Sequence, residues 1–82
     1  MRPIAINIDE IYIPLALRKQ PVDAAKVQVI AENIAEVGLQ TPISVREDVD
    51  RYVLVSGLHR LEACKALGEK TIAVYIVQAR KF

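Results

Sequence analysis

The sequence predicts an α+β domain in which two helices pack on a small mixed β-sheet. Two segments of helical periodicity alternate with short runs rich in Ile and Val, which indicates helices and strands mixed along one chain. The 82 residues fit a single domain, 1–82, with a small core. Because 52% of the residues are hydrophobic and only 5% are aromatic, we expect that core to be aliphatic.

The first part of the chain predicts a strand followed by a loop. The segment 4–8 is rich in Ile and alternates loosely, which indicates a strand. The segment 11–13 either extends this strand or forms a second short one. From Pro14 we expect an extended loop, with Leu15 and Leu17 packed beneath it.

The first helix is predicted from Asp23 to about Val37. Asp23 can cap its N-terminus, and Gly38 is a natural stop. Apolar residues at helical spacing form the stripe that we expect to be buried: Val27, Ile30, Ala31, Ile34 and Val37. The charged residues expected on the solvated face are Lys26, Glu32 and Glu36.

A hairpin, a second helix and a last strand follow. The segments 43–46 and 51–55 are separated by a polar turn, which predicts a hairpin. The second helix is expected over 58–67, with Cys64 as a small buried residue. The run 71–77 is the longest apolar run of the chain and predicts a buried central strand.

The strongest candidate site is the turn before the second helix, where the chain reads Ser56, Gly57, Leu58, His59 and Arg60. A helix N-terminus offers backbone N–H groups and the positive end of the helix dipole, so it can hold an anion. Gly57 allows a ligand to approach closely, and Arg60 can bind phosphate oxygens through two N–H groups. The only histidine, His59, can donate hydrogen bonds, and Ser56 can cap the helix or bind the ligand.

A purely structural turn is the alternative explanation of these residues. Arg60 can pair with a carboxylate such as Glu36, and His59 can cover the helix end. The glycine spacing fits neither a Walker A loop nor a dinucleotide fingerprint. No carboxylate is placed to orient Ser56 and His59 for nucleophilic catalysis, and the acidic pairs elsewhere have no reason to meet the turn.

Composition narrows the class of protein. A net charge of +1 gives no broad basic field, so DNA affinity would need a local patch. One Cys excludes an internal disulfide, and one Cys with one His argues against a structural metal site. Because no signal peptide or membrane-spanning run is visible, we expect a cytoplasmic protein without membrane contact.

Taken in order, these segments resemble the ParB/sulfiredoxin-like domain, which is the N-terminal domain of chromosome and plasmid partition proteins and is also called the ParB-like nuclease family. The resemblance covers almost the whole chain and implies the ParB/sulfiredoxin-like fold. The matching segments are Ile4 to Ile8, Pro14 to Arg18, Ile30 to Val45, Tyr52 to Gly57, His59 with Arg60, Ala63, and Ile72 to Val74.

The resemblance implies a nucleotide phosphate site at the Gly57 turn, with ATP or CTP and Mg²⁺ as the expected cofactors. In partition proteins this turn reads Gly-Glu-Arg-Arg-x-Arg and binds CTP, and Leu58 and Glu62 depart from that pattern. Two remote residues are implied as well. Thr41 stands where the family's upstream phosphate motif has Gln, and Arg18 belongs to a loop that the family places beside the site.

The catalytic residues of the relatives are missing. Sulfiredoxins carry Gly-Cys-His-Arg at this turn, where Leu58 replaces the catalytic Cys and Cys64 lies about two helical turns away. Related serine kinases carry Asp-Gly-His-His-Arg, and Ser56 stands at the Asp. We therefore expect binding rather than catalysis. Sulfiredoxin activity is not expected, and nothing visible supports nucleotide hydrolysis or nuclease activity.

The predicted function is binding of a nucleotide or another phosphate, in plasmid, phage or chromosome partition or in transcription regulation. One alternative is a DNA-binding module, nuclease-like by family, whose turn holds the DNA backbone. Because no helix-turn-helix follows, we expect no reading of a specific DNA site. Another alternative is a non-catalytic interaction domain or homodimer that uses Leu15, Leu17 and the terminal strand near Phe82.

Overall fold

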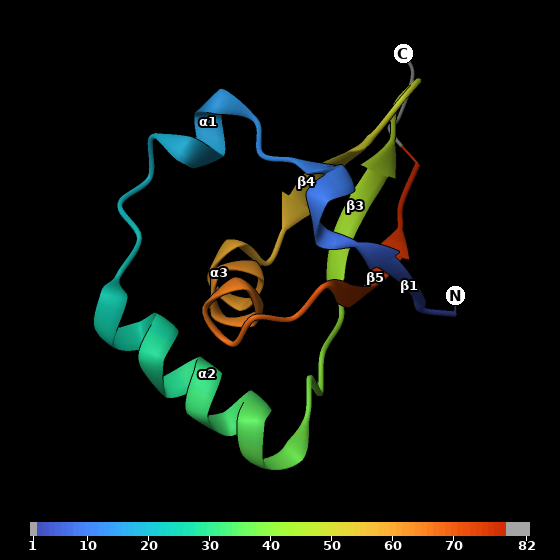
Figure 1. Ribbon diagram of the computed structural model, residues 1–82. Helices are drawn as coiled ribbons and strands as arrows, with labels where there is room; N and C mark the ends of the chain where they lie inside the picture. Colours follow the sequence, from blue (N-terminus) through green and yellow to red (C-terminus); the bar gives the residue numbers. More distant parts are fainter. Residues whose placement is uncertain (1, 79–82) are drawn as a thin grey trace.

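The computed structural model describes residues 2–78 and shows a sheet with helices on one side (Figure 1). In chain order the elements are β1 (Ile4–Asn7), the 3-10 turn η1 (Ile8–Glu10), β2 (Ile11–Tyr12), α1 (Leu15–Arg18), α2 (Ala24–Val37), β3 (Ile43–Glu47), β4 (Tyr52–Ser56), α3 (Leu58–Ala66) and β5 (Thr71–Ile76). In Figure 1 the sheet lies to the right, α3 lies beside it and α2 lies farther out.

The sheet mixes parallel and antiparallel pairs, with its five described strands in the order β1-β5-β3-β4-β2. β1 pairs antiparallel with β5, and β3 antiparallel with β4. β3 is parallel to β5, and β4 is parallel to β2. This arrangement confirms the predicted α+β class and the predicted hairpin, and it places the long apolar run in an interior strand, β5.

Aliphatic side chains form the core, as the composition predicts. The largest fully buried ones are Ile43, Val45, Leu54, Leu61 and Val74. Cys64 is 3% exposed within this cluster, which confirms its expected burial. Because α3 contributes Leu58, Leu61 and Cys64 to the core, it is the central helix of the fold.

α2 packs against α3 and has no fully buried side chain. The predicted cap is confirmed, since the Asp23 carboxylate accepts hydrogen bonds from the N–H groups of Ala25 and Lys26 at 3.0 and 3.2 Å. Four residues of the predicted stripe are half-buried, but Val37 is 53% exposed, so its predicted burial is wrong. The nine-residue α3 is too short to cover all of the 14-residue α2.

The segment after Pro14 differs from the expected extended loop, because it forms the single helical turn α1. The N–H groups of Leu17 and Arg18 both donate to the Pro14 carbonyl at 3.0 Å. A proline suits a helix start, since its missing N–H would have no partner there. Leu17 packs against the core as expected, but Leu15 is 56% exposed, so its predicted burial is wrong.

The N-terminal strand ends one residue earlier than predicted, at Asn7, because the chain turns through η1. The segment 11–13 then forms a separate short strand, β2, rather than an extension of β1. No helix within residues 2–78 is long and apolar enough to cross a membrane. The surface expected near Phe82 falls outside the described residues.

Candidate anion-binding site

The turn at Gly57 joins β4 to α3 and requires a glycine for two reasons. Its φ of +103° lies in the left-handed region that side chains disfavour. A Cβ at this position would also lie 2.5 Å from Cγ2 and 2.8 Å from Cβ of Ile43, a fully buried residue of β3. The glycine therefore lets α3 begin close against the sheet.

The N-terminus of α3 has backbone donors available for an anion. The N-cap residue is Gly57, which has no side chain that could accept a hydrogen bond. No other side chain caps the helix, so the predicted cap by Ser56 is wrong. The first hydrogen bond of the helix runs from the Leu61 N–H to the Gly57 carbonyl at 2.9 Å. Helix geometry leaves the preceding N–H groups, those of Leu58, His59 and Arg60, without an acceptor inside the helix.

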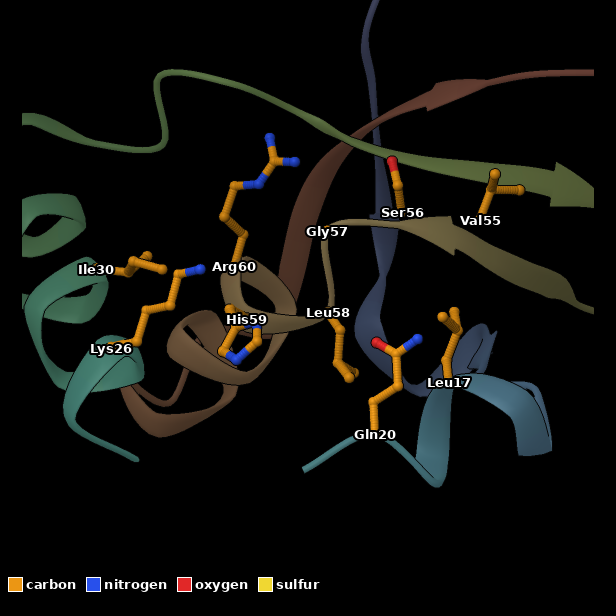
Figure 2. A pocket seen from close by; sticks show the side chains of 10 residues that line it. All are labelled: Leu17, Gln20, Lys26, Ile30, Val55, Ser56, Gly57, Leu58, His59 and Arg60. Carbon is orange, nitrogen blue, oxygen red and sulfur yellow. The ribbon is translucent and has the colours of Figure 1, made fainter. Parts of the chain in front are cut away.

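An open cavity of about 360 Å³ lies at this helix N-terminus (Figure 2). Its polar lining comes from Gln20, Lys26, Ser56, His59 and Arg60. Its apolar lining comes from Leu17, Ile30, Val55 and Leu58. Figure 2 shows Lys26, His59 and Arg60 on one side of the cavity and Leu17 and Val55 on the other. The five residues of the predicted turn thus lie together.

The ionised side chains that line this cavity are cationic. Lys26 and Arg60 supply positive charge, and within residues 2–78 no Asp or Glu contributes to the lining. Lys26 is exposed, as the sequence predicts, but the sequence prediction assigned it no part in the site. Its only sequence signal is its place in the first turn of the first helix, and that signal does not reveal that this turn faces Gly57.

His59 connects the two long helices. Its Nε2 accepts a hydrogen bond from the backbone N–H of Asp23, the N-cap of α2, at 3.3 Å. A ring nitrogen can accept this bond only while it carries no proton. His59 therefore does more than cover the end of α3, because it holds the start of α2 beside the cavity.

Arg60 is held by backbone carbonyls rather than by Glu36. Its Nη1 donates to the carbonyls of Thr41 and Pro42 at 3.0 and 3.2 Å. A guanidinium has five N–H donors, so the Nη2 and Nε groups are left for a ligand. The carbonyls fix the direction of the side chain and tie the 41–42 segment to α3.

The two remote residues of the prediction, Arg18 and Thr41, do not line this cavity. The Arg18 Nη2 donates to the Tyr12 hydroxyl at 3.2 Å, and Arg18 is not among the residues that line the cavity, although Leu17 and Gln20 beside it are. Thr41 lines a neighbouring hollow of about 350 Å³. Ile30 and Arg60 border both hollows, so the two are adjacent.

Cys64 is unsuited to act as a nucleophile. It is buried in the core, and burial, with a smaller contribution from Glu69, raises the pKa of its thiol. A buried thiol of raised pKa forms little of the reactive thiolate at neutral pH. Leu58, which stands where sulfiredoxins carry their Cys, has an apolar side chain that is mostly buried.

A small mixed sheet with helices packed on it and an open hollow at the N-terminus of α3 fits the ParB/sulfiredoxin-like fold. The family model for the ParB N-terminal domain matches residues 3–81. The chain belongs to this family.

Two curated relatives match most of the chain. A chloroplastic/mitochondrial sulfiredoxin of Arabidopsis thaliana is 36% identical over 78 residues, which are 95% of this chain and 62% of the relative. A probable chromosome-partitioning protein ParB of Campylobacter jejuni is 35% identical over 71 residues, which are 87% of this chain and 26% of the relative. The chain thus spans less than two thirds of either relative.

Solved structures share the fold. The crystal structure of the Arabidopsis thaliana sulfiredoxin has a TM-score of 0.85, at 35% identity over 94% of this chain and 85% of that chain. A truncated ParB of Caulobacter crescentus complexed with CTP-γ-S has a TM-score of 0.83, at 20% identity over 96% of this chain and 46% of that one. The same protein complexed to the centromeric parS site scores 0.81, at 21% identity over 95% of this chain and 42% of that one. A free serine kinase in complex with AMP has a TM-score of 0.77, at 19% identity over 93% of this chain and 31% of that one.

Proposed function

We propose that this domain binds the phosphate group of a nucleotide at the Gly57–Arg60 turn. The observation that carries the proposal is that the uncapped N-terminus of α3, Lys26 and Arg60 meet around one cavity. Backbone N–H groups there would hold phosphate oxygens, and the free donors of Arg60 would bind two of them. His59 and Ser56 are the further polar contacts.

The neighbouring hollow offers a place for the nucleoside part of the ligand. Four apolar side chains line it together with four polar ones that can fix orientation: Val29, Ile30, Ile34 and Leu39, and Asn33, Gln40, Thr41 and Arg60. Since Arg60 borders both hollows, a phosphate beside it leaves the rest of a nucleotide within reach of the second one. Thr41 would then contact the nucleoside rather than the phosphate.

The expected Mg²⁺ would come with the nucleotide. Among residues 2–78 no group of three or more His, Cys, Asp or Glu side chains is arranged to hold a metal. Magnesium retains most of its water ligands and commonly binds phosphates with only one or two carboxylates. A phosphate-bound Mg²⁺ therefore fits the site better than a resident metal, and ATP and CTP remain the proposed cofactors.

We infer binding without catalysis for the site. Among the described residues that line the cavity, no acid is present to orient a nucleophile. Leu58 stands at the position where sulfiredoxins carry their Cys. The partition or regulatory context, a homodimer and a cytoplasmic location stay predictions. The name of the Arabidopsis thaliana relative places that protein in chloroplasts and mitochondria.

Isothermal titration calorimetry with ATP, CTP and GTP, with and without Mg²⁺, tests the proposal. Replacing Lys26 by Ala should weaken binding about 10- to 100-fold, which corresponds to the loss of one hydrogen bond between charged groups. The free energy of unfolding of the Lys26→Ala variant should differ from that of the wild type by no more than about 0.5 kcal/mol, because Lys26 is exposed. Arg60→Ala should weaken binding as well, and Lys70→Ala is the matched control away from the cavity.

The absence of heat or thermal shift with all three nucleotides would contradict the proposal. So would equal affinities for the Lys26→Ala and Lys70→Ala variants, because only Lys26 lines the cavity.

A DNA backbone is the second candidate ligand, because the Caulobacter crescentus relative of the same fold has been solved with parS DNA. The phosphate diesters of DNA would bind at the same Gly57–Arg60 turn. The affinity should then fall steeply with salt, and Arg60→Ala should reduce the slope of log K against log salt by about one. Retention on DNA that does not depend on salt would argue against this function.

A further inference from the structure

His59 occupies a position that two different partners need. It lines the phosphate cavity, and its Nε2 also accepts the backbone N–H of Asp23 at 3.3 Å. It is the only histidine of the chain, and its side chain is half-buried. The start of α2 and the cavity are therefore linked through one imidazole.

The two partners favour different forms of the imidazole. A backbone N–H can donate to Nε2 only while that nitrogen carries no proton. A phosphate beside the ring favours the imidazolium, since an anion stabilises the charged form and accepts hydrogen bonds from it. Histidine changes its charge between pH 5 and 8, so both forms are accessible near neutral pH.

The other charged groups around His59 act in both directions. Lys26 of α2 and Arg60 of α3 line the same cavity and oppose protonation of the ring by like charge. The carboxylate of Asp23 carries the opposite charge, and its Oδ1 accepts two N–H groups of α2. An anion in the cavity offsets the two cations and shifts this balance toward the imidazolium.

We propose that His59 is a proton-linked switch, in which an anion bound at the Gly57–Arg60 turn draws a proton onto Nε2 and releases the backbone N–H of Asp23. The proton comes from solvent, and the freed N–H turns to water. Ligand binding thus loosens the contact between the start of α2 and α3. This inference rests on the proposed phosphate site.

Sulfate is the probe of choice, because it remains a dianion over the whole range of histidine titration, whereas phosphate does not. Binding to the full chain should be about three- to tenfold tighter at pH 6 than at pH 8, because an anion that favours the imidazolium binds more tightly where histidine is protonated. Calorimetry in buffers of different ionisation enthalpy should show proton uptake near pH 7.

NMR follows the switch directly. The single histidine Hε1 signal should titrate at higher pH when sulfate is present. The amide signal of Asp23 should follow the same curve, because its hydrogen bond is lost as Nε2 gains a proton.

His59→Gln is the matched variant. A glutamine carbonyl can accept the Asp23 N–H but cannot gain a proton near neutral pH. The variant should fold, bind sulfate with an affinity that is flat between pH 6 and 8, and show no proton uptake.

Two outcomes overturn the switch, and they separate it from the binding site. Sulfate binding that is equally tight at pH 6 and pH 8 in the wild-type protein rejects the switch and leaves the phosphate site intact. No sulfate binding at either pH rejects the switch, and it rejects the phosphate site as well when none of the three nucleotides binds.

Discussion

Gly57 serves the fold and the proposed site at the same position. Its left-handed backbone turns the chain from β4 into α3, and its missing side chain makes room for Ile43. As the N-cap it also leaves the first N–H groups of α3 without a capping side chain. A single residue therefore sets where the donors of the cavity lie.

Replacing Gly57 by Ala should destabilise the protein far more than the same change at Gly68. Both residues have positive φ, for which a Cβ costs about 1–2 kcal/mol. Only at Gly57 would the new Cβ also meet a buried side chain, and forced overpacking adds about 1–3 kcal/mol. Urea denaturation measures both variants, and equal losses of unfolding free energy would show that the contact with Ile43 is not limiting.

Cys64 should give the protein a stability limit at alkaline pH. Burial raises the pKa of its thiol, so the folded state holds this proton more tightly than the unfolded state. The stability that the protonated thiol contributes to the folded state is fully present below the ordinary thiol pKa of 9.0. This stability is lost as the pH rises through the raised pKa of the folded state. The difference in unfolding free energy between the wild type and Cys64→Ala should therefore shrink above this pH. A constant difference from pH 7 to 10.5 would contradict the assignment.

At the scale of elements, the site depends on two helices that begin side by side. α3 lies against the sheet, and α2 packs against α3. Two features position α2: the hydrogen bond from the Asp23 N–H to His59, and the half-buried apolar stripe of the helix. The carbonyls of Thr41 and Pro42, in the segment between α2 and β3, hold the guanidinium of Arg60. The lining of the cavity itself comes from α1 and the segment after it, from α2, from the end of β4 and from α3.

The cap of α2 can be tested apart from the cavity. Asp23→Ala removes both hydrogen bonds to the first turn and should cost about 1 kcal/mol of unfolding free energy, while Asp23→Asn should retain most of it. Both variants keep the backbone N–H that His59 accepts. Thermal unfolding compares them, and an unchanged Asp23→Ala protein would mean that the helix start is not limiting for stability.

Local patterns predicted what depends on neighbours in sequence. The cap at Asp23, the hairpin, the strand 71–77 and the α3 turn all follow from spacing and residue type. The exposure of Leu15 and Val37 did not follow, because it depends on which element covers each residue. Lys26 in the cavity was missed for the same reason, since only the tertiary contact between α2 and α3 brings it to Gly57.

The whole molecule is a layered domain, with the sheet, then α3, then α2 (Figure 1). The proposed ligand would contact α3 and α2, and at Gly57 it would contact the turn that joins the sheet to α3. Binding should therefore oppose unfolding of the entire domain rather than of one segment.

A nucleotide at 100 times its Kd should stabilise the folded chain by about 2.7 kcal/mol. For a domain of this size that corresponds to a rise in Tm of about 10–20 °C. Differential scanning calorimetry measures this shift. A nucleotide that binds by calorimetry but leaves Tm unchanged would show that it binds folded and unfolded chains equally.

The absence of fully buried side chains in α2 has a consequence for how this domain can diversify. Its outward residues, such as Val29 and Asn33, border the second hollow without supporting the core. If the proposed site binds a nucleotide, substitutions there should alter which ligand is preferred while the turn at Gly57 and the folding of the domain are preserved. The proposed site would thus combine a fixed phosphate contact at the start of α3 with a variable wall from α2, which makes α2 the helix to randomise when a new ligand is sought.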